Sequence, residues 1–328
     1  MIDRRPFVSF IAVWLLALPF ATLAQPATKV PRIGFLGIDS ELQTERVAAF
    51  LDGLRALGYV DGRNVVIEYQ WAEGHSDRLP ELASELVKRN VDVIVTAGMP
   101  AVSAARGATS TIPIVGAAMN NPVELGFVAD LRRPGGNVTG IAFQGADLST
   151  KRLDLFRQAV PGLKKLAVIW NDAQGAQVKS VQRVEAAARA MGIQVLTLEI
   201  RQPGDFATAI AEAKAWGANG LLQIPAQFIS KHRAVLIEQL RLHRLPATCE
   251  ARMYVVDGCL MAYGASLEAM FRRSATYVDR ILKGADPANL AIEQPREFEF
   301  LINGKTADAL KLTIPQSLQY QMTEPLLQ

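Results

Sequence analysis

Acidic and amide side chains follow several of the predicted strands, at positions where they could bind a small molecule. The acids are Asp39, Asp172 and Glu250, and the main amides are Asn120 and Asn171. A carboxylate can pair with the ammonium group of an amino acid, and an amide can hydrogen-bond a neutral group. We rank Glu250 first as the partner of an ammonium group, then Asp39, then Asp172. Each acid could instead be a solvated loop residue or a helix cap, and each amide a turn residue that stabilises its own loop.

The stretch AGMPA, residues 97–101, could bind an anion. Pro100 suits the first turn of a helix, whose free backbone amides and positive dipole end favour a carboxylate. Gly98 and Met99 would lie at this helix start. The remaining candidates for ligand binding, in loops or in strands that leave a sheet, are Phe143, Gln227 and Tyr263.

The sequence gives little support for catalysis or metal binding. It contains no Gly-x-Ser-x-Gly and no His-Glu-x-x-His motif, and no Cys-x-x-Cys. The three histidines, His75, His232 and His243, are scattered, and we expect the last two on a solvated helix face. We therefore expect no enzyme, no cofactor and no metal site.

The charge balance argues against nucleic acid as a partner. The 328 residues carry 35 Lys and Arg against 32 Asp and Glu, a net charge of +3, and no basic cluster stands out. Half of the residues are apolar, which is typical of a globular protein with a substantial core. At roughly 150 residues per domain, a chain of this length predicts two domains.

Short β-branched runs alternate with amphipathic segments of helical length from Arg32 onward. The first half predicts strands at 32–37, 64–72, 91–98 and 112–118, with a helix after each of the first three strands, Gly58 as a C-cap and Ser76 as an N-cap. The second half predicts strands at 163–170, 193–200 and 219–225, and helices at 178–192, 205–217 and 229–244. Continuous apolar strands separated by helices predict parallel sheets covered on both faces.

The stretch RPGGNVTGIAF, residues 133–143, lies where the first series ends. Its glycines suggest a phosphate loop and its Asn-x-Thr a glycosylation site. A phosphate loop needs Lys and then Ser or Thr after its last glycine, but Ile141 and Ala142 follow Gly140. A hydrophobic strand would bury the asparagine of a glycosylation site. We therefore interpret the stretch as a turn and a strand that lead from one lobe to the other.

Two further crossings are predicted at 257–266 and 291–303, so that three segments connect two α/β lobes. The predicted fold is a pair of doubly wound parallel-sheet lobes, which would bind a ligand between the carboxyl ends of their strands. The predicted boundaries are residues 30–143 with 265–291 for the amino-terminal lobe and residues 144–264 with 292–320 for the carboxyl-terminal lobe.

Residues 1–24 read as a secretory signal. Arg4 and Arg5 provide the positive start, an apolar run extends from Phe7 to Phe20, and small residues precede a cut after Ala24. The apolar run is short for a membrane span, which needs about 20 residues, although an anchor helix is the alternative. Because no lipobox cysteine follows, we expect an exported protein that is not a lipoprotein and has no membrane span after cleavage.

The two cysteines, Cys249 and Cys259, lie ten residues apart in a chain that we expect to mature in an oxidising compartment. A disulfide would form if neighbouring strands brought them face to face. Two buried thiols that pack as small hydrophobic groups are the alternative, and the one that we favour from the sequence.

Segments spread from about Pro31 to Leu318 match a known family in order. They are GYVDGRNVVIEYQWAEG, RLPELASELVKRNVDVIVTAG, ATSTIPIV, NPVELGFVADLRRPGGNVTG, VPGLKKLAVIWN, CLMAYG, RSATYVDRILKGADPANLAIEQP and INGKTADALKLTIPQSL. The chain resembles the substrate-binding proteins of ABC transporters with the type I periplasmic-binding fold, in the group that includes tryptophan- and tyrosine-uptake binding proteins. The resemblance implies a periplasmic, monomeric protein that delivers a small molecule to ABC permease and ATPase subunits. The alternative is a ligand sensor that signals to a membrane-bound receptor or kinase.

The sequence departs from the pattern of this family at four places. The family usually has a small hydroxylated residue at Met99, an Asp at Asn120 or Asn121, an Asp at or near Ala226, and an acid near Met253. These departures favour a less cationic ligand that is aromatic or otherwise apolar. Its site could be lined by Met99, Phe143, Met253 and Tyr254.

Overall fold

The computed structural model describes residues 29–40, 44–143, 145–171 and 177–327, and only the backbone for Phe143 and residues 145–147. Its elements belong to one compact unit, Pro31–Gln328. The predicted signal segment, residues 1–24, lies outside the described residues. Among the residues described, none of the helices combines the length and the apolar character that a membrane span requires.

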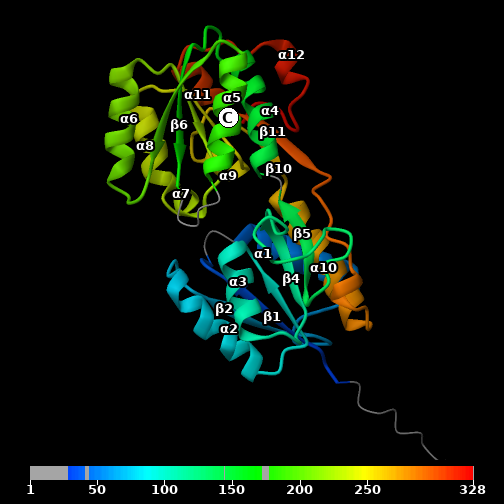
Figure 1. The fold of residues 1–328 in the computed structure, drawn as a ribbon. Helices are drawn as coiled ribbons and strands as arrows, with labels where there is room; N and C mark the ends of the chain where they lie inside the picture. Colours follow the sequence, from blue (N-terminus) through cyan, green and yellow to red (C-terminus); the bar gives the residue numbers. More distant parts are fainter. Residues whose placement is uncertain (1–28, 41–43, 144, 172–176, 328) are drawn as a thin grey trace, which may run out of the picture. The chain divides into compact units, whose positions relative to one another are not determined.

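Five parallel strands form the sheet of the amino-terminal lobe, in the order β2-β1-β3-β4-β5 (Figure 1). The strands are β1 Arg32–Gly37, β2 Val66–Trp71, β3 Val93–Thr96, β4 Ile114–Asn120 and β5 Val138–Phe143. The helices of this lobe are α1 Thr44–Ala56, η2 Ser76–Arg78, α2 Leu79–Lys88, α3 Met99–Ala108, α10 Leu267–Leu282 and η3 Pro287–Asn289.

Helices cover both faces of this sheet. On one face, Phe50 of α1 and Phe271 of α10 pack in one cluster with Phe35 of β1. On the other face, Leu86 of α2 and Val102 of α3 pack in a second cluster. Strands buried on both faces need continuous apolar sequence, which is why the sequence of this lobe predicts its strands well.

Six strands form the sheet of the carboxyl-terminal lobe, in the order β11-β10-β9-β8-β6-β7 (Figure 1). The strands are β6 Lys165–Trp170, β7 Gln194–Glu199, β8 Gly220–Gln223, β9 Ala247–Cys249, β10 Met261–Ala265 and β11 Phe298–Ile302. The helices of this lobe are α4 Gly145–Ala159, α5 Val178–Ala190, α6 Asp205–Trp216, α7 Gln227–Lys231, α8 Arg233–Leu242, α9 Arg252–Val256, α11 Gly304–Ala309 and α12 Gln316–Gln319.

The second sheet is covered in the same way. Phe156 of α4 and Val184 of α5 pack in one core cluster, and Phe206 of α6 and Leu236 of α8 pack in another. The prediction of two doubly wound lobes is confirmed, except that the second sheet is not wholly parallel. Its edge strand β11 runs antiparallel to β10, with Met261 opposite Ile302, because the chain returns to this sheet from the other lobe.

Three segments lead from one lobe to the other, as predicted. The first follows β5 into α4. In the second, β10 ends at Ala265 and Ser266 caps α10, which packs against α1. In the third, the backbone of Glu293 pairs with Gly140 and Ala142 beside β5, and the chain then enters β11. Of the predicted crossing at residues 291–303, which we expected to be a strand, only Phe298–Ile302 is a regular strand.

The stretch at 133–143 has an architectural role. Gly140 has a φ of 132°, and a Cβ there would lie 2.1 Å from the carbonyl oxygen of Gly116 on β4, so only glycine fits between the paired strands. The side chain of Asn137 donates to the carbonyl oxygens of Thr109 and Ile112 at 3.0 and 2.9 Å. This asparagine therefore ties two loops of its own lobe together.

Two local predictions are wrong. Ser76 does not cap α2, because it begins the 3-10 turn η2 and the helix starts after Arg78 without a side-chain cap. His232 and His243 do not share a helix face, because they are the two residues that flank α8. The ring of His232 instead packs against Phe228, with 4.6 Å between the ring centroids.

Candidate functional site

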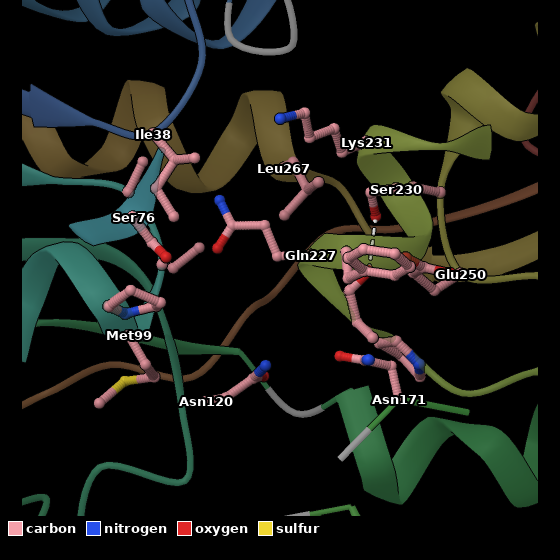
Figure 2. Close-up of a pocket in the computed structure, with 18 of the residues that line it drawn as sticks. Ile38, Ser76, Met99, Asn120, Asn171, Gln227, Ser230, Lys231, Glu250 and Leu267 are labelled. Atoms are coloured by element: carbon pink, nitrogen blue, oxygen red, sulfur yellow. Dashed lines mark hydrogen bonds between the residues drawn. The ribbon is translucent and has the colours of Figure 1, made fainter. Parts of the chain in front are cut away.

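A cavity of about 390 Å³ lies at the carboxyl ends of strands from both sheets, where ligands of open α/β sheets bind. Its wall comes from the loops after β1, β2, β3, β4, β6, β8 and β9, from the first turns of helices that follow them, and from Leu267 and Phe271 at the start of α10 (Figure 2). The volume is in the range of small-molecule sites. The site residues predicted from the sequence that line it are Gly98, Met99, Asn120, Asn171, Gln227 and Glu250.

The other four predicted residues have different places. Asp39 and Tyr263 are not part of the cavity wall. Asp172 lies outside the described residues, and for Phe143 only the backbone is described.

Two tyrosines that the sequence offered as ligand contacts pack within the carboxyl-terminal lobe. The ring of Tyr263 stacks on Phe298, with 6.3 Å between centroids and an interplanar angle of 12°. Tyr254 is fully buried, and its hydroxyl is hydrogen-bonded to the hydroxyl of Ser230 at 2.9 Å. Tyr254 therefore supports the wall through Ser230, which lines the cavity, whereas the ring of Tyr263 packs on β11.

Among the residues that the structure describes, Glu250 provides the acidic side chain of the cavity wall. It is 7% exposed, and its Oε2 atom accepts no hydrogen bond from the described part of the chain. Burial raises the pKa of its carboxyl group, and the positive charges of Arg152 and Arg46 act in the opposite direction. A buried carboxylate oxygen without a donor is costly, so this atom is suited to accept a hydrogen bond from a ligand.

Arg152 provides a buried positive charge behind Glu250. It comes from α4 and is fully buried, and its Nε and Nη1 atoms donate to the carbonyl oxygens of Tyr263 and Gln223 at 3.1 and 2.9 Å. Burial lowers the pKa of its guanidinium, whereas the carboxylate of Glu250 raises it. This buried residue could not be predicted from the sequence, because a single Arg on an amphipathic helix normally faces water.

The backbone at Glu250 is packed closely against β10. A Cβ on Gly264 would lie 1.8 Å from the carbonyl oxygen of Glu250. We expect Gly264→Ala to push the two strands apart, to lower the free energy of unfolding by about 1–3 kcal/mol, and to weaken ligand binding through displaced Glu250. Chemical denaturation and calorimetry would measure the two effects.

Gly107 of α3 offers a control for this substitution. A Cβ there meets no atom within 4 Å, so Gly107→Ala should leave binding unchanged and slightly stabilise the helix. If Gly264→Ala and the wild type have equal stability and equal ligand affinity, the close contact between Gly264 and the backbone of Glu250 is needed for neither property.

The start of α3 offers donors to an anion. Gly98 precedes the helix with a φ of 82°, a conformation that favours glycine. The backbone N–H groups of Met99 and Ala101 lie in the first turn of α3, where no preceding helical carbonyl can accept a hydrogen bond from them. Pro100, which has no N–H, lies between them. From the other lobe, Gln227 extends toward this turn (Figure 2), and its Oε1 would be 3.4 Å from a Cβ on Gly98.

Two cations of the cavity wall were not expected from the sequence. Arg46 lies in the first turns of α1 and Lys231 at the end of α7. An Nη atom of Arg46 donates to the thioether sulfur of Met253 at 3.4 Å, and the Nζ atom of Lys231 donates to the carbonyl oxygen of Gly74 at 3.2 Å. The residues predicted from the sequence lie mostly in the loops after the strands, whereas the helical turns that follow these loops also reach the cavity.

The rest of the wall is mostly apolar with neutral hydrogen-bonding groups. Asn120 ends β4, and the Nδ2 atom of Asn171 donates to the carbonyl oxygen of Ile200 at 2.8 Å, so Asn171 ties the loop after β6 to the segment after β7. The large apolar side chains of the wall are Ile38, Met99, Leu125, Phe228, Met253, Leu267 and Phe271.

Two α/β lobes that share a cavity at the ends of their strands define the class of type I periplasmic-binding folds. Residues 35–325 match a family model described as ABC transporter substrate binding protein. The chain therefore belongs to the ABC transporter substrate-binding protein family. Members of this family bind solutes and are not enzymes, and they are typically extracellular or periplasmic. The family and fold that the sequence suggested are thus confirmed.

Comparison with individual proteins agrees with this assignment. The chain is 27% identical to a tyrosine-binding protein of Clostridioides difficile (strain R20291), over 80% of this chain and 75% of the relative. It is similar in structure to an ABC domain from Streptococcus pneumonia in complex with L-Trp, with a TM-score of 0.83, 22% identity, and coverage of 90% of this chain and 99% of the other. A conserved domain protein from Vibrio cholerae O1 biovar eltor has a TM-score of 0.82 and 26% identity, with the same coverage.

Proposed function

We propose that this protein is the solute-binding component of an ABC import system, and that it binds an aromatic or otherwise apolar α-amino acid between its lobes and delivers it to a membrane permease. The observation that carries the proposal is Glu250, a buried carboxylate at the wall of a cavity that also contains the start of α3. An α-amino acid has one ammonium and one carboxylate. The two groups match these two features.

The charges of the wall support a ligand with a carboxylate. Arg46 and Lys231 are its cations and Glu250 is its acid among the described residues. With Glu250 paired to the ligand ammonium, the amides of Met99 and Ala101 and the positive end of α3 would receive the carboxylate. In this arrangement Met99 needs no side-chain hydroxyl, because backbone amides supply the donors.

The apolar wall supports an aromatic or large aliphatic side chain on the ligand. Phe228 and Phe271 offer rings, and Met99 and Met253 offer flexible thioethers that adapt to the shape of a ligand. The names of a tyrosine-binding relative and of a similar structure that contains L-Trp point in the same direction.

Transport requires the two lobes to close on the ligand. We assign residues 30–143 with 265–291 to the amino-terminal lobe, and residues 144–264 with 292–320 to the carboxyl-terminal lobe. A ligand shifts such an equilibrium only through contacts with both lobes, and Glu250 and α3 provide one contact on each side. Export by cleavage after Ala24, and release into the periplasm without a lipid anchor, are part of the proposal.

Isothermal titration calorimetry tests the proposed ligand class. The panel contains the aromatic, large aliphatic, acidic and basic amino acids, together with aromatic acids that lack an amino group. We expect the tightest binding among aromatic or large aliphatic amino acids, and scattering should show compaction on binding. Preference for a basic amino acid, or no binding by any member of the panel, would contradict the proposal.

Affinity should fall at acidic pH because Glu250 must be ionised to pair with an ammonium group. Burial raises the pKa of this carboxyl above the ordinary value of about 4.3. As pH falls through that raised pKa, the folded protein takes up a proton before the unfolded chain does, so the folded state gains stability while ligand binding weakens. Calorimetry across the acidic range should show this loss in the wild type and not in Glu250→Gln, and an equal loss in both would contradict it.

A further inference from the structure

Cys249 and Cys259 lie side by side in the core of the carboxyl-terminal lobe. Their sulfur atoms are 3.2 Å apart, and the residues are 0% and 1% exposed. Cys249 ends β9, and Cys259 comes two residues before β10, which pairs with β9 in parallel. A disulfide bond has an S–S length of about 2.05 Å, so a shift of about 1 Å would bring the two sulfur atoms to bonding distance.

The backbone between the two cysteines forms a compact turn. The amide of Cys259 donates to the carbonyl oxygen of Tyr254 at 2.7 Å, and the amide of Asp257 donates to that of Met253 at 3.1 Å. The short helix α9, Arg252–Val256, occupies the middle of this segment. The turn therefore holds both sulfur atoms in place, and a bond between them requires no rearrangement of the fold.

We propose that Cys249 and Cys259 form an intramolecular disulfide in the exported protein. The oxidant is a disulfide-bearing thiol oxidant of the export compartment. One thiolate attacks that disulfide and releases one of its thiols, and the second cysteine thiolate then attacks the mixed disulfide and releases the other. The two cysteines lose two protons and two electrons, and the oxidant is reduced to two thiols. This proposal depends on export, but it does not depend on which ligand the cavity binds.

The bond should form while the lobe is folding. Both sulfur atoms are buried in the finished lobe, and burial raises the pKa of the Cys249 thiol. The reactive thiolate is therefore disfavoured, and an oxidant cannot reach it. Folded protein that is already reduced should resist oxidation, whereas protein that refolds with an oxidant present should acquire the bond.

The disulfide would fix the part of the cavity wall that carries Glu250. The ring that it closes, residues 249–259, contains Glu250, Ala251 and Met253, which line the cavity. A cross-link over a ring of this size restricts the unfolded chain and should raise the melting temperature by about 5 °C. It would also limit the movement of α9 when a ligand enters or leaves.

Peptide mapping of the exported protein tests the proposal. The sample is unfolded without reductant, alkylated with iodoacetamide and cut with trypsin, which separates the cysteines because Arg252 lies between them. We expect residues 245–252 and 253–272 as one linked pair without alkylation, which reduction splits. Alkylation of both cysteines, or a link to a second copy of the chain, would overturn the proposal.

Refolding shows whether the disulfide forms before the carboxyl-terminal lobe has finished folding, and whether it stabilises the folded protein. Purified chain is refolded with oxidised and reduced glutathione or with reductant alone, and native reduced protein is incubated with the same glutathione mixture. We expect the linked peptides and the higher melting temperature only after oxidative refolding. The Cys249→Ala/Cys259→Ala variant should show no difference between the two refolding conditions. A melting temperature that the oxidant raises equally in that variant, or leaves unchanged in the wild type, would refute the stabilising role.

Discussion

Glu250→Gln is expected to weaken the binding of an aromatic amino acid about 100-fold. The substitution keeps the size of the side chain but replaces the carboxylate that the ammonium group would meet in a buried place. Removing one partner of a buried charge pair at an interface costs about 2–5 kcal/mol, which corresponds to a factor of about 30 or more in affinity. Calorimetry with the best ligand of the panel measures the change.

Two controls separate this interaction from a general effect of removing an acid. Glu268 belongs to a neighbouring cavity and not to the wall around Glu250, so Glu268→Gln should retain wild-type affinity. The ligand can also be changed, because a deaminated analogue has no ammonium group. The wild type should prefer the amino acid to its analogue, and Glu250→Gln should lose most of that preference. If Glu250→Gln binds the amino acid as well as the wild type does, the proposed role of Glu250 is wrong.

The strand and helix pattern of this chain could be predicted from the sequence because both sheets are covered on two faces. The strands VIVT and KLAVIW are continuous apolar runs, and the helices that follow them show a 3.6-residue period. The direction of β11 could not be predicted in this way. Phe298–Ile302 has an ordinary strand sequence, and its antiparallel pairing depends on where the chain re-enters the second lobe.

The position of the cavity could be predicted from the sequence more reliably than the side chains that line it. A residue at the end of a parallel strand or just after it must lie at the carboxyl edge of its sheet, which explains why Gly98, Asn120 and Glu250 line the cavity. Tyr263 belongs to a strand, and its ring direction depends on packing against Phe298. Such packing involves contacts between segments far apart in the sequence, and no local pattern encodes it.

The burial of Arg152 is a second feature that no local sequence pattern encodes. Substitution of this residue has the largest expected effect on stability. Nothing in RLDLFRQA distinguishes Arg152 from Arg157 on the same helix, yet the first is fully buried and the second is half exposed. The guanidinium of Arg152 joins the carbonyl oxygens of Gln223 on β8 and Tyr263 on β10. It thereby connects strands on either side of β9, next to the backbone that carries Glu250.

Arg152→Met is expected to lower the free energy of unfolding by about 3–5 kcal/mol. The methionine fills much of the space, but the carbonyl oxygens of Tyr263 and Gln223 each lose the hydrogen bond from Arg152, and the carboxylate of Glu250 loses its nearby buried cation. Arg152→Lys should recover only part of the loss, because an ammonium group does not have the planar fork that reaches both carbonyl groups. Urea denaturation at neutral pH measures these differences.

Arg157→Met is the matched control. Its guanidinium is half exposed and pairs with Asp154 at 3.5 Å on the surface of the same helix, so the loss should be within about 0.5 kcal/mol. Combining Arg152→Met with Glu250→Gln should cost less than the sum of the two single substitutions, because the carboxylate that Arg152 balances is then also absent. If the losses in unfolding free energy add strictly, the two buried charges are independent of one another. The same follows if Arg152→Met is as stable as the wild type. The wall that presents Glu250 to the ligand would then be held by the strand contacts at Gly264 and by the turn between the two cysteines.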